Sequence, residues 1–407
     1  MRLRVKVATQ IFIAIVLGAG AGVLLGEKAG HLKVVGDIFI SLLKMIIVPL
    51  IVASMVCGIT SVGDIRKLGR MGVRTLVYYL ATTVLAAGVG LVLVNVIQPG
   101  AGVDMGLTAA ADLETGQAPS AISLIKDIVP ENVFAAMTGD KVLSVIFFSL
   151  ILGVAISSIG EKGKAAAAFF DSFNAAMMKI TGWIMRLAPL GVFALMASTI
   201  GQMGMGVIKP LGAYMATVVT GLGIHACVTL SVLLGIFGRY SALKFARHVF
   251  GAVATAFSTA SSAATLPITM ECVEQNVGVS NRVASFVLPL GATINMDGTA
   301  LYEAVAAMFI AQAYGIDLTM GQQLVIVFTA TLASIGAAAI PGAGLVTMVI
   351  VLTAVKLPLE GIGMLLAVDR LLDMFRTAVN VWGDACGAAV VARLDGERFD
   401  SDDQTRP

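Results

Sequence analysis

Charged side chains are scarce in this chain of 407 residues. Asp, Glu, Lys and Arg together make up 13% of it, whereas a soluble globular domain carries about 25%. Hydrophobic residues account for 58%, and the mean hydropathy is +0.93. This composition excludes an ordinary soluble domain and predicts a chain that crosses a lipid bilayer many times. The net charge is only +2, with no basic patch that would indicate nucleic-acid binding.

Cysteine and histidine are also rare. The four cysteines are Cys57, Cys227, Cys272 and Cys386. They lie far apart and show no CxxC or Cys/His spacing, so neither a zinc site nor a disulfide framework is expected. Of the three histidines, His225 lies in an apolar run and is interpreted as a satisfied core residue rather than a ligand.

Long apolar runs are abundant, and a helix needs roughly 20 mostly apolar residues to cross a bilayer. Runs of this kind lie at about 8–26, 34–62, 73–98, 142–160, 166–200, 207–237, 281–312 and 362–392. The segments 249–275 and 322–356 are apolar too, but small residues and proline interrupt them in AFSTASSAATLP and ASIGAAAIPGAG. The sequence therefore predicts eight transmembrane helices and two segments of another kind.

Basic residues are unevenly distributed between these spans. They cluster at 2–6, 66–74, 161–164 and 238–248. The loop at 99–122 carries acids but no base. Because Lys and Arg favour the cytoplasmic side, the basic loops are expected inside and the acidic loop outside. This predicts a multi-pass protein of the cell inner (plasma) membrane with both termini in the cytoplasm.

The two interrupted segments fit best as re-entrant hairpins. The flanks of 249–275 both look cytoplasmic, and the flanks of 322–356 both look external. Small residues let the backbones approach closely at each tip, and Pro267 and Pro341 break helix geometry. Irregular backbone at membrane depth is tolerated where it is buried in protein or lines a cavity. Paired interrupted segments of this type indicate inverted repeats around a binding site at the membrane midplane.

A polar stripe runs along the last span, through LLDMFRTAVNVWGDACG. Its members are Asp369, Asp373, Arg376, Asn380 and Asp384. The spacings of 4, 3, 4 and 4 place them on one face of a helix. A charge at mid-bilayer costs at least about 2.5–3.5 kcal/mol, so the stripe must face a cavity, a ligand or other charges. A buried ion pair, in which Asp373 or Asp369 neutralises Arg376, is the structural alternative, but it leaves two acids and Asn380 without a partner.

A second polar island occupies GATINMDGTALYEA, and it carries Asn295, Asp297, Thr299 and Glu303. Gly298 in mid-helix costs about 1 kcal/mol relative to alanine and permits local unwinding. Freed carbonyls with Asn and Asp oxygens would bind a dehydrated hard cation, since no Cys or His ligand is present. The charge is low for calcium, so sodium is favoured.

With these residues the sequence resembles the dicarboxylate/amino acid:cation symporter family, which includes the glutamate/aspartate transporters. The matching stretches are NMDGTALYEA, STASSAATLP, SIGAAAIPGAGL, DRLLDMFRTAVNVWGD and YYLATT, within a resemblance over nearly the whole chain. The resemblance implies an all-α polytopic membrane protein with the glutamate-transporter fold: eight transmembrane helices, two re-entrant helical hairpins and inverted repeats. It also implies a homotrimer in the lipid bilayer, with an elevator mechanism.

The same resemblance divides the chain into a static scaffold and a moving transport domain. The scaffold would comprise 1–72 and, at the trimerisation interface, 100–204. The transport domain would comprise 73–99 and 205–394, including both hairpins. A polar, solvated tail would occupy 395–407.

For the substrate, the resemblance assigns the side-chain carboxylate to Arg376, whose guanidinium can bind it bidentately. It assigns the α-ammonium group to Asp373. Further implied substrate contacts are Ser261, Ser262, Thr299, Ile340, Gly344, Thr377 and Asn380. The two serines would meet the α-carboxylate at the first hairpin tip. Ile340 and Gly344 would lie at the second tip, the extracellular gate.

For sodium, the resemblance implies three sites and no organic cofactor. One would use Gly291, Asn295, Asn380 and Asp384. A deeper one would use Tyr79, Thr82, Thr83, Asn295 and Asp297. A third, built mostly from backbone, would use Thr293, Ser334, Ile335 and Ala337. Glu303 would carry a proton, because proton-coupled members have an acid at this place.

Details of the match refine the substrate. Asp373 favours an amino acid, because dicarboxylate members need no partner for an ammonium group. Arg376 favours aspartate or glutamate, because members that take neutral amino acids lack this base. The departures are Ala260 at the first hairpin tip, Met374 within the stripe, which leaves potassium counter-transport open, and the bulky Trp382, which is expected to point away from the site.

Three other functions remain for comparison. A C4-dicarboxylate:cation symporter is the nearest alternative, and competition between aspartate and succinate would separate the two. A ligand-gated anion channel is another, which saturable, sodium-dependent turnover would exclude. Asp297 and Asp384 could form the dyad of an intramembrane aspartyl protease, but the GxGD context is absent. The protein is therefore expected not to be an enzyme.

Overall fold

The structure, a computed structural model, describes residues 7–61, 69–102, 129–138, 142–203, 208–335 and 343–398. Within these ranges every regular element is a helix and no strand occurs. The expected all-α class is therefore confirmed for the described part of the chain.

The helices of the first half are α1 (Val7–Leu25), η1 (Gly26–Leu32), α2 (Lys33–Ser61), α3 (Gly69–Ile97), α5 (Val133–Thr138), α6 (Val142–Ser158), η2 (Gly160–Gly163) and α7 (Lys164–Met203). The middle of the chain forms α8 (Ile208–Ile224), η4 (His225–Leu230), α9 (Ser231–Leu233), η5 (Leu234–Gly238), α10 (Ala242–Thr259), α11 (Ser262–Glu271) and η6 (Cys272–Val277). The last part forms α12 (Asn281–Ile294), α13 (Asp297–Ala313), α14 (Met320–Ile335), α15 (Ala343–Ala354), η7 (Leu359–Gly361) and α16 (Ile362–Leu394).

Two described helices are long and apolar enough to cross a membrane, Arg70–Ile97 and Lys209–Gly238. A third candidate is the pair Gly160–Ile184 and Arg186–Ser198, which is bent by 46°. The 33-residue α16 is long enough but carries the charged stripe, and the 281–312 run is divided into α12 and α13. The expected runs thus coincide closely with helices, while the number of spans stays a prediction.

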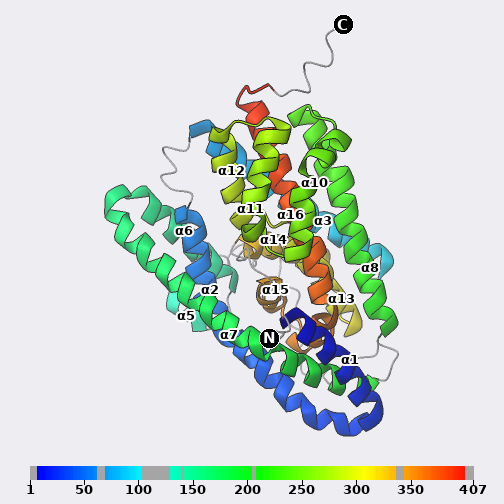
Figure 1. Ribbon diagram of the computed structural model, residues 1–407. Helices are drawn as coiled ribbons and strands as arrows, with labels where there is room; N and C mark the ends of the chain where they lie inside the picture. The colour runs from blue at the N-terminus through cyan, green and yellow to red at the C-terminus, as the bar shows by residue number, and fades with distance from the viewer. Residues whose placement is uncertain are drawn as a thin grey trace, which may run out of the picture.

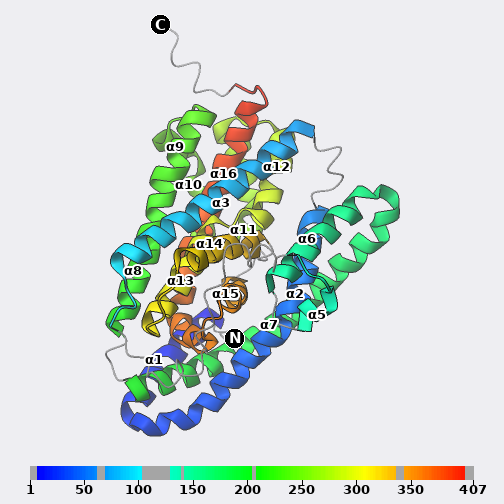
Figure 2. The same ribbon diagram turned by 180° about the vertical axis from the view of Figure 1, so that it is seen from behind.

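The helices gather into two groups, visible in Figure 1 and from behind in Figure 2. Along one flank, α2, α6 and α7 pack together, and α1 packs on α7 at the foot of this flank. Beside them stands an upright group that contains α3, α8, α10, α11, α12 and α16. The helices α13, α14 and α15 lie low in the upright group. Of these, α14 and α15 contact α2 of the flank, whereas α13 packs against α3 and α8. The flank comprises the helices predicted for the scaffold.

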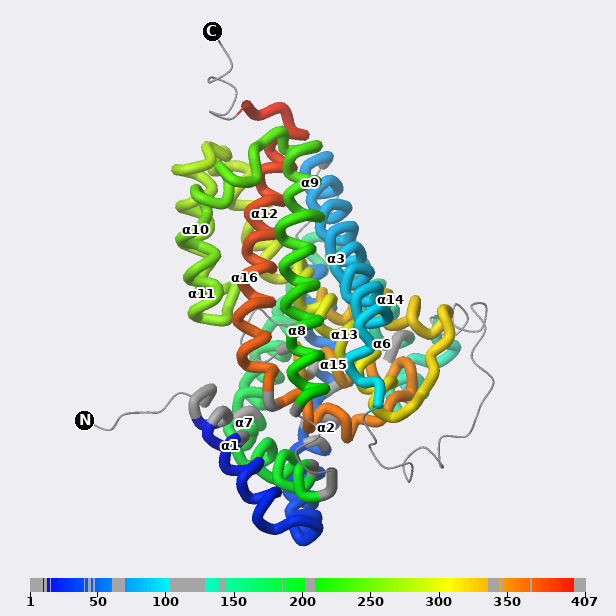
Figure 3. The backbone as a smooth tube through the Cα atoms, turned by 90° about the vertical axis from the view of Figure 1, so that its right-hand side faces the viewer, coloured from blue at the N-terminus to red at the C-terminus, as the bar shows by residue number. Residues whose placement is uncertain are grey.

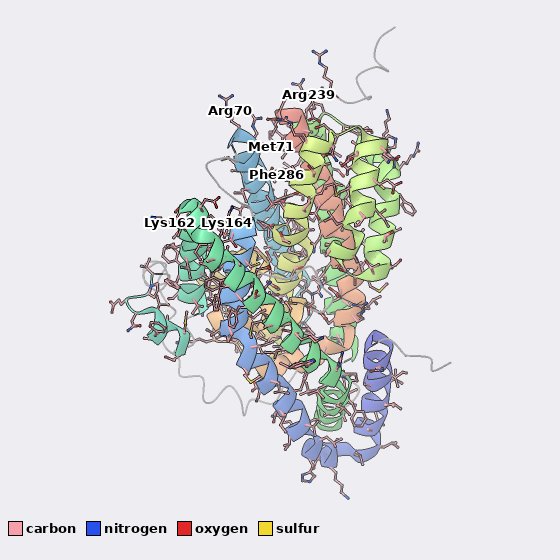
Figure 4. The ribbon with its side chains drawn as sticks, turned by 60° about the vertical axis from the view of Figure 1, so that its left-hand side comes forward. Arg70, Met71, Lys162, Lys164, Arg239 and Phe286 are labelled. Atoms are coloured by element: carbon pink, nitrogen blue, oxygen red, sulfur yellow. The ribbon has the colours of Figure 1, made fainter. Side chains whose placement is uncertain are left out.

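The basic residues that end several helices lie toward one end of the molecule. Figure 4 shows Arg70 and Arg239 at the end from which the C-terminal segment leaves, and Lys162 and Lys164 at the corresponding tip of the flank. Labelled residues from three of the four basic clusters predicted to be cytoplasmic therefore lie toward one end of the fold, and the fourth cluster, 2–6, is outside the described residues.

The segment 249–275 forms most of a helical hairpin. Helix α10 ends at Thr259, and Ala260 adopts a left-handed conformation with φ of +50°. Ser261 then caps α11, since its hydroxyl oxygen accepts a hydrogen bond from the Ala264 amide at 3.2 Å. Figure 3 shows both arms side by side, with the turn part-way along α16. The turn residues match the predicted tip.

The predicted unwinding in the second polar island is confirmed, but its position differs. The helix is broken at Asn295 and Met296, whose φ/ψ values are −87°/92° and −120°/49°. Gly298 lies inside the first turn of α13. It is required for another reason: a Cβ there would lie 2.7 Å from the carbonyl oxygen of Arg376 and 2.9 Å from its Cα. The glycine therefore lets α13 approach the backbone of α16.

Candidate functional site

The polar stripe of α16 meets α13 in the interior of the protein. Arg376 is 1% exposed, and its Nη2 lies 2.9 Å from an oxygen of Asp373 and 3.1 Å from an oxygen of Asp369. The guanidinium carbon lies 3.9 Å from the centre of the Tyr302 ring, in a cation–π arrangement. The predicted alternative of a buried ion pair is therefore correct for one edge of the guanidinium.

Two nitrogens of the same guanidinium are unpaired. Within the described residues, Nε and Nη1 of Arg376 are buried and have no hydrogen-bond partner. Buried donors in native proteins are nearly always paired, and an orphaned one requires an explanation. Nη1 carries two N–H groups, and the oxygens of an anion can accept hydrogen bonds from them. The Nη1 edge of the guanidinium can therefore receive an anionic ligand.

The second interrupted segment covers this edge. The backbone of Gly344, near the start of α15, lies so close that a Cβ there would overlap Nη1 of Arg376. Thr347, one turn later, donates a hydrogen bond from its hydroxyl to the Gly344 carbonyl at 3.2 Å. The predicted gate residue Ile340 and the predicted sodium ligand Ala337 lie outside the described residues.

The predicted substrate residues on α16 and α13 are brought together. Thr377, Asn380 and Thr299 are buried. The Thr377 hydroxyl donates to the Asp373 carbonyl at 2.8 Å. Asn380 accepts a hydrogen bond from the Gly298 amide at 2.7 Å, so its side chain connects α16 to the start of α13.

The first hairpin reaches α16 through aromatic rings. The rings of Phe257 on α10 and Phe375 on α16 meet edge to face, with centres 5.1 Å apart. Phe375 immediately precedes Arg376 in the chain. Ser261 and Ser262 lie at the hairpin tip as predicted, and Ser262 is buried. Their contact with a substrate stays a prediction.

The first predicted sodium site lies at the helix break. The Asn295 side-chain amide donates to a carboxylate oxygen of Asp384 at 2.9 Å. Gly291 lies beside them, because a Cβ there would be 2.6 Å from the same oxygen of Asp384. Asn380 lies one turn before Asp384 on α16 and contacts Met296 in the break, with its Nδ2 3.3 Å from the sulfur.

The deeper predicted site surrounds Asp297. Its Oδ1 accepts hydrogen bonds from the hydroxyls of Thr83, at 2.7 Å, and Thr82, at 3.2 Å. Thr82 is also 3.4 Å from the side-chain oxygen of Asn295, and the Tyr79 hydroxyl donates to the Val287 carbonyl at 3.0 Å. These side chains are buried. The donor set on α3 and α13 is rich in oxygen and suits an alkali cation.

The third predicted site lies where α12 and α14 pack against each other. The Thr293 hydroxyl donates to the Leu290 carbonyl, and the Ser334 hydroxyl donates to the Thr331 carbonyl, both at 2.9 Å. Ser334 and Ile335 are buried at the end of α14. Both hydroxyls thus bond to their own helices, and ligation by this group stays a prediction.

The predicted proton carrier is deeply buried. Glu303 lies on α13 with no exposed surface. Its polar neighbours are the Thr347 hydroxyl of α15 and the Arg376 guanidinium. Within the described residues neither of its carboxylate oxygens forms a hydrogen bond.

The sequence is similar to those of known proteins over nearly the full length of the chain. Residues 7–394 match the sodium:dicarboxylate symporter family. The chain belongs to this family. Excitatory amino acid transporter 3 of Homo sapiens is 40% identical, in an alignment that covers 96% of the chain and 86% of the transporter. The proton/sodium-glutamate symport protein of Geobacillus stearothermophilus is 37% identical, with 97% and 96% covered. That of Bacillus subtilis (strain 168) is 36% identical, with 97% and 94% covered.

Membership of the sodium:dicarboxylate symporter family makes the chain an integral membrane transporter and not an enzyme. The aspartyl-protease interpretation is thereby excluded.

Asp369, one of the two acids expected to neutralise Arg376 in the ion-pair alternative, forms an ion pair with it. Sequence reasoning missed two other residues of this symporter's site. Tyr302 supports the guanidinium with its ring. His225, interpreted as a satisfied core residue, is buried but contacts Asp297, with its Nε2 3.0 Å from Oδ2. These contacts join residues from α13, α16 and η4, so no local pattern could have shown them.

Proposed function

We propose that the protein is a secondary active symporter that takes up L-aspartate or L-glutamate together with sodium ions. The observation that carries the proposal is the buried guanidinium of Arg376, whose Nε and Nη1 are unpaired while its Nη2 contacts the carboxylate of Asp373. A base and an acid at one site complement a zwitterion with an acidic side chain. The names of the human and bacterial relatives, an excitatory amino acid transporter and proton/sodium-glutamate symporters, support this substrate class.

The two acids at Arg376 have different roles in this proposal. Asp369 stays paired with Nη2 and keeps the charge of the empty site balanced. Asp373 turns from Arg376 toward the α-ammonium group when the amino acid binds. The substrate's side-chain carboxylate accepts hydrogen bonds from Nη1 of Arg376, which carries two N–H groups. Binding still adds one net negative charge to the site, because an acidic amino acid carries two carboxylates and one ammonium group.

Sodium binding couples to substrate binding through charge. The helix break gathers Asp297 and Asp384, which lie buried with Asn295 between them. Without cations these carboxylates oppose the entry of an acidic substrate. Sodium ions neutralise them and favour closure of the second hairpin over Arg376. Equal substrate affinity in sodium-free buffer would contradict this coupling.

Glu303 carries a proton in the same cycle. It lies between Arg376 and Thr347, where a neutral carboxyl group balances the site better than an ionised one. Two of the relatives bear the name proton/sodium-glutamate symport protein, which supports the assignment.

The wider architecture follows the resemblance. The protein spans the plasma membrane eight times, with both hairpins re-entrant and both termini cytoplasmic. Three copies form a trimer through the scaffold, and the transport domain moves as an elevator. The separation of α2, α6 and α7 from the upright helix group supports this division.

Uptake of radiolabelled L-aspartate into proteoliposomes, driven by an inward sodium gradient, tests the proposal. Saturable uptake by the wild type is expected, with loss in Arg376→Ala and retention in the control Arg239→Ala at an exposed helix end. Transport of succinate instead of aspartate would place the protein among C4-dicarboxylate symporters. Flux that neither saturates nor depends on sodium would indicate a channel.

A further inference from the structure

The imidazole of His225 occupies one side of Asp297. Its Nε2 lies 3.0 Å from Oδ2, and both side chains are fully buried. Since a carboxylate oxygen only accepts, Nε2 carries the hydrogen of this bond. The other carboxylate oxygen, Oδ1, takes the hydroxyls of Thr82 and Thr83. Asp297 is thus held from two sides by donors of different kinds.

A local irregularity fixes the position of His225. The helix that follows α8 widens into the π-helix η4, which begins at His225. Such segments are frequent at functional sites. Within η4, the Ala226 carbonyl accepts hydrogen bonds from the Ser231 hydroxyl at 3.0 Å and from the Trp382 indole N–H at 3.2 Å. The ring of Trp382 also packs on Phe245, with centres 5.4 Å apart. Helix α16 therefore anchors the turn that presents the imidazole, and Trp382 points away from Arg376 as expected.

The two sets of donors differ in what they can release. A threonine hydroxyl can rotate, stop donating to Oδ1 and offer its own lone pairs to a cation. An imidazole N–H cannot, because its nitrogen has no lone pair available while it carries the hydrogen. A cation that enters between α3 and α13 can therefore replace the hydroxyl hydrogens on Oδ1 but not the imidazole on Oδ2.

We propose that His225 is a positioning residue of the deep sodium site: its Nε2–H holds Oδ2 of Asp297, so that Oδ1 alone is presented to the cation. The inference rests on the proposed sodium-coupled function and adds a residue to its site. One oxygen with two hydroxyls suits a small ion of low charge, whereas a carboxylate that binds with both oxygens suits calcium. Without His225 the carboxylate rotates freely, and sodium binds more weakly.

Sodium binding can be measured without amino acid through tryptophan fluorescence. The chain has two tryptophans, and Trp183 is half exposed on α7. The background variant Trp183→Phe leaves Trp382, which contacts the turn of His225, as the probe. Purified full-length protein is titrated with sodium chloride in exchange for choline chloride. The test variants are His225→Ala, His225→Asn and His225→Gln, and only the glutamine amide reaches as far as Nε2.

The matched control is Thr217→Val on α8. Thr217 is buried like His225, but its hydroxyl bonds to the carbonyl of Ala213 in its own helix. It tests whether truncating any buried polar group near η4 changes sodium binding.

We expect His225→Ala and His225→Asn to raise the half-saturating sodium concentration at least tenfold. His225→Gln should stay within threefold of the background variant, and Thr217→Val should match it. At saturating sodium, half-saturation by L-aspartate should change less than threefold in all of them. If the alanine variant does not elute as folded protein in size-exclusion chromatography, the asparagine and glutamine variants carry the comparison.

Two results would overturn the inference, and they differ from failure of the proposed function. An unchanged sodium titration in His225→Asn would show that the imidazole does not serve the cation. Equal weakening in the glutamine and asparagine variants would show a packing role instead of an N–H donor. If the background variant itself shows no response to sodium, the sodium assignment fails, and the role of His225 fails with it.

Discussion

The backbone of Gly344 lies against the guanidinium of Arg376, so closely that a Cβ at residue 344 would overlap Nη1. The contact joins α15, at one arm of the second interrupted segment, to the unpaired edge of the only fully buried arginine among the described residues. Ligand binding at this edge and the position of α15 are therefore linked, because the ligand and the backbone of Gly344 both lie beside Nη1.

Gly344→Ala is expected to weaken L-aspartate binding at least tenfold, or about 1.4 kcal/mol. The methyl group forces either α15 or the guanidinium to move away. Concentration-dependent uptake in proteoliposomes measures the effect. Gly321→Ala on α14 is the control, because the nearest atom to a Cβ there is 3.9 Å away. A Gly344→Ala variant with unchanged half-saturation would show that α15 withdraws from Arg376 before substrate binds.

Asp373→Asn is expected to change selectivity rather than abolish anion binding. The amide cannot pair with an ammonium group, so L-aspartate should lose about 100-fold in affinity, or about 2.7 kcal/mol. Succinate, which has no ammonium group, should become the better competitor. Competition of both compounds against labelled substrate measures this, with the exposed acid in Asp317→Asn as the control. Unchanged preference for aspartate would move the ammonium site away from Asp373.

Glu303→Gln is expected to separate proton flux from amino-acid flux. The glutamine occupies the same buried position between Thr347 and Arg376 but cannot release a proton. Sodium-driven aspartate uptake should persist and lose its increase at low pH. A pH-sensitive dye inside the liposomes should report acidification with wild-type protein and none with the variant. Proton flux that continues in Glu303→Gln would assign the proton to another group.

Gly298→Ala is expected to destabilise the protein by about 1–3 kcal/mol, as overpacking in a core does. The added Cβ would lie 2.7 Å from the Arg376 carbonyl oxygen, and backbone cannot move aside as a flexible side chain can. The Tm of purified protein should fall by several degrees. Gly212→Ala on α8 is the matched control, since a Cβ there meets nothing within 4 Å. Equal Tm values would indicate that α13 shifts along α16 without strain.

The end of α16 is tied to two other helices, and this predicts a salt-sensitive stabilisation. Asp395 forms ion pairs with Arg74 of α3, at 3.3 Å, and with Arg282 of α12. These partly exposed pairs contribute about 0–1 kcal/mol each. Asp395→Ala should therefore lower the Tm slightly in dilute choline chloride, and concentrated choline chloride should remove the difference by screening. A difference that persists in concentrated salt would point to helix capping instead.

Much of the fold was predictable from the sequence because membrane helices leave strong local signals. Apolar runs predicted the positions of α1, α2, α3, α6, α7 and the long helix from α8 to the end of η5 to within a few residues. The Gly- and Asn-containing island predicted the break between α12 and α13, although it misplaced the break relative to Gly298. The serine-bearing segment predicted the turn between α10 and α11. Each of these features depends on residues that are close together in the chain.

Part of the site was predictable for the same reason. The spacing of Asp373, Arg376, Asn380 and Asp384 puts them on one helix face whatever surrounds it. Charged side chains are costly in a bilayer unless they are paired, so partners were expected for them. The resemblance indicated what those partners are. The structure places Asp373 on Arg376 and Asn295 on Asp384.

The sequence by itself thus determined that the protein lies in a lipid bilayer, where its helices lie along the chain, and which face of α16 is polar. Composition and helical periodicity are local properties, so no tertiary structure is needed to read them. Only the tertiary structure decided which edge of Arg376 stays open, since that depends on Asp369, Tyr302 and Gly344 together. It also decided that His225 forms a hydrogen bond with Asp297, which lies 72 residues away in the chain. Contacts between distant residues follow from how helices pack, and no pattern within one segment encodes them.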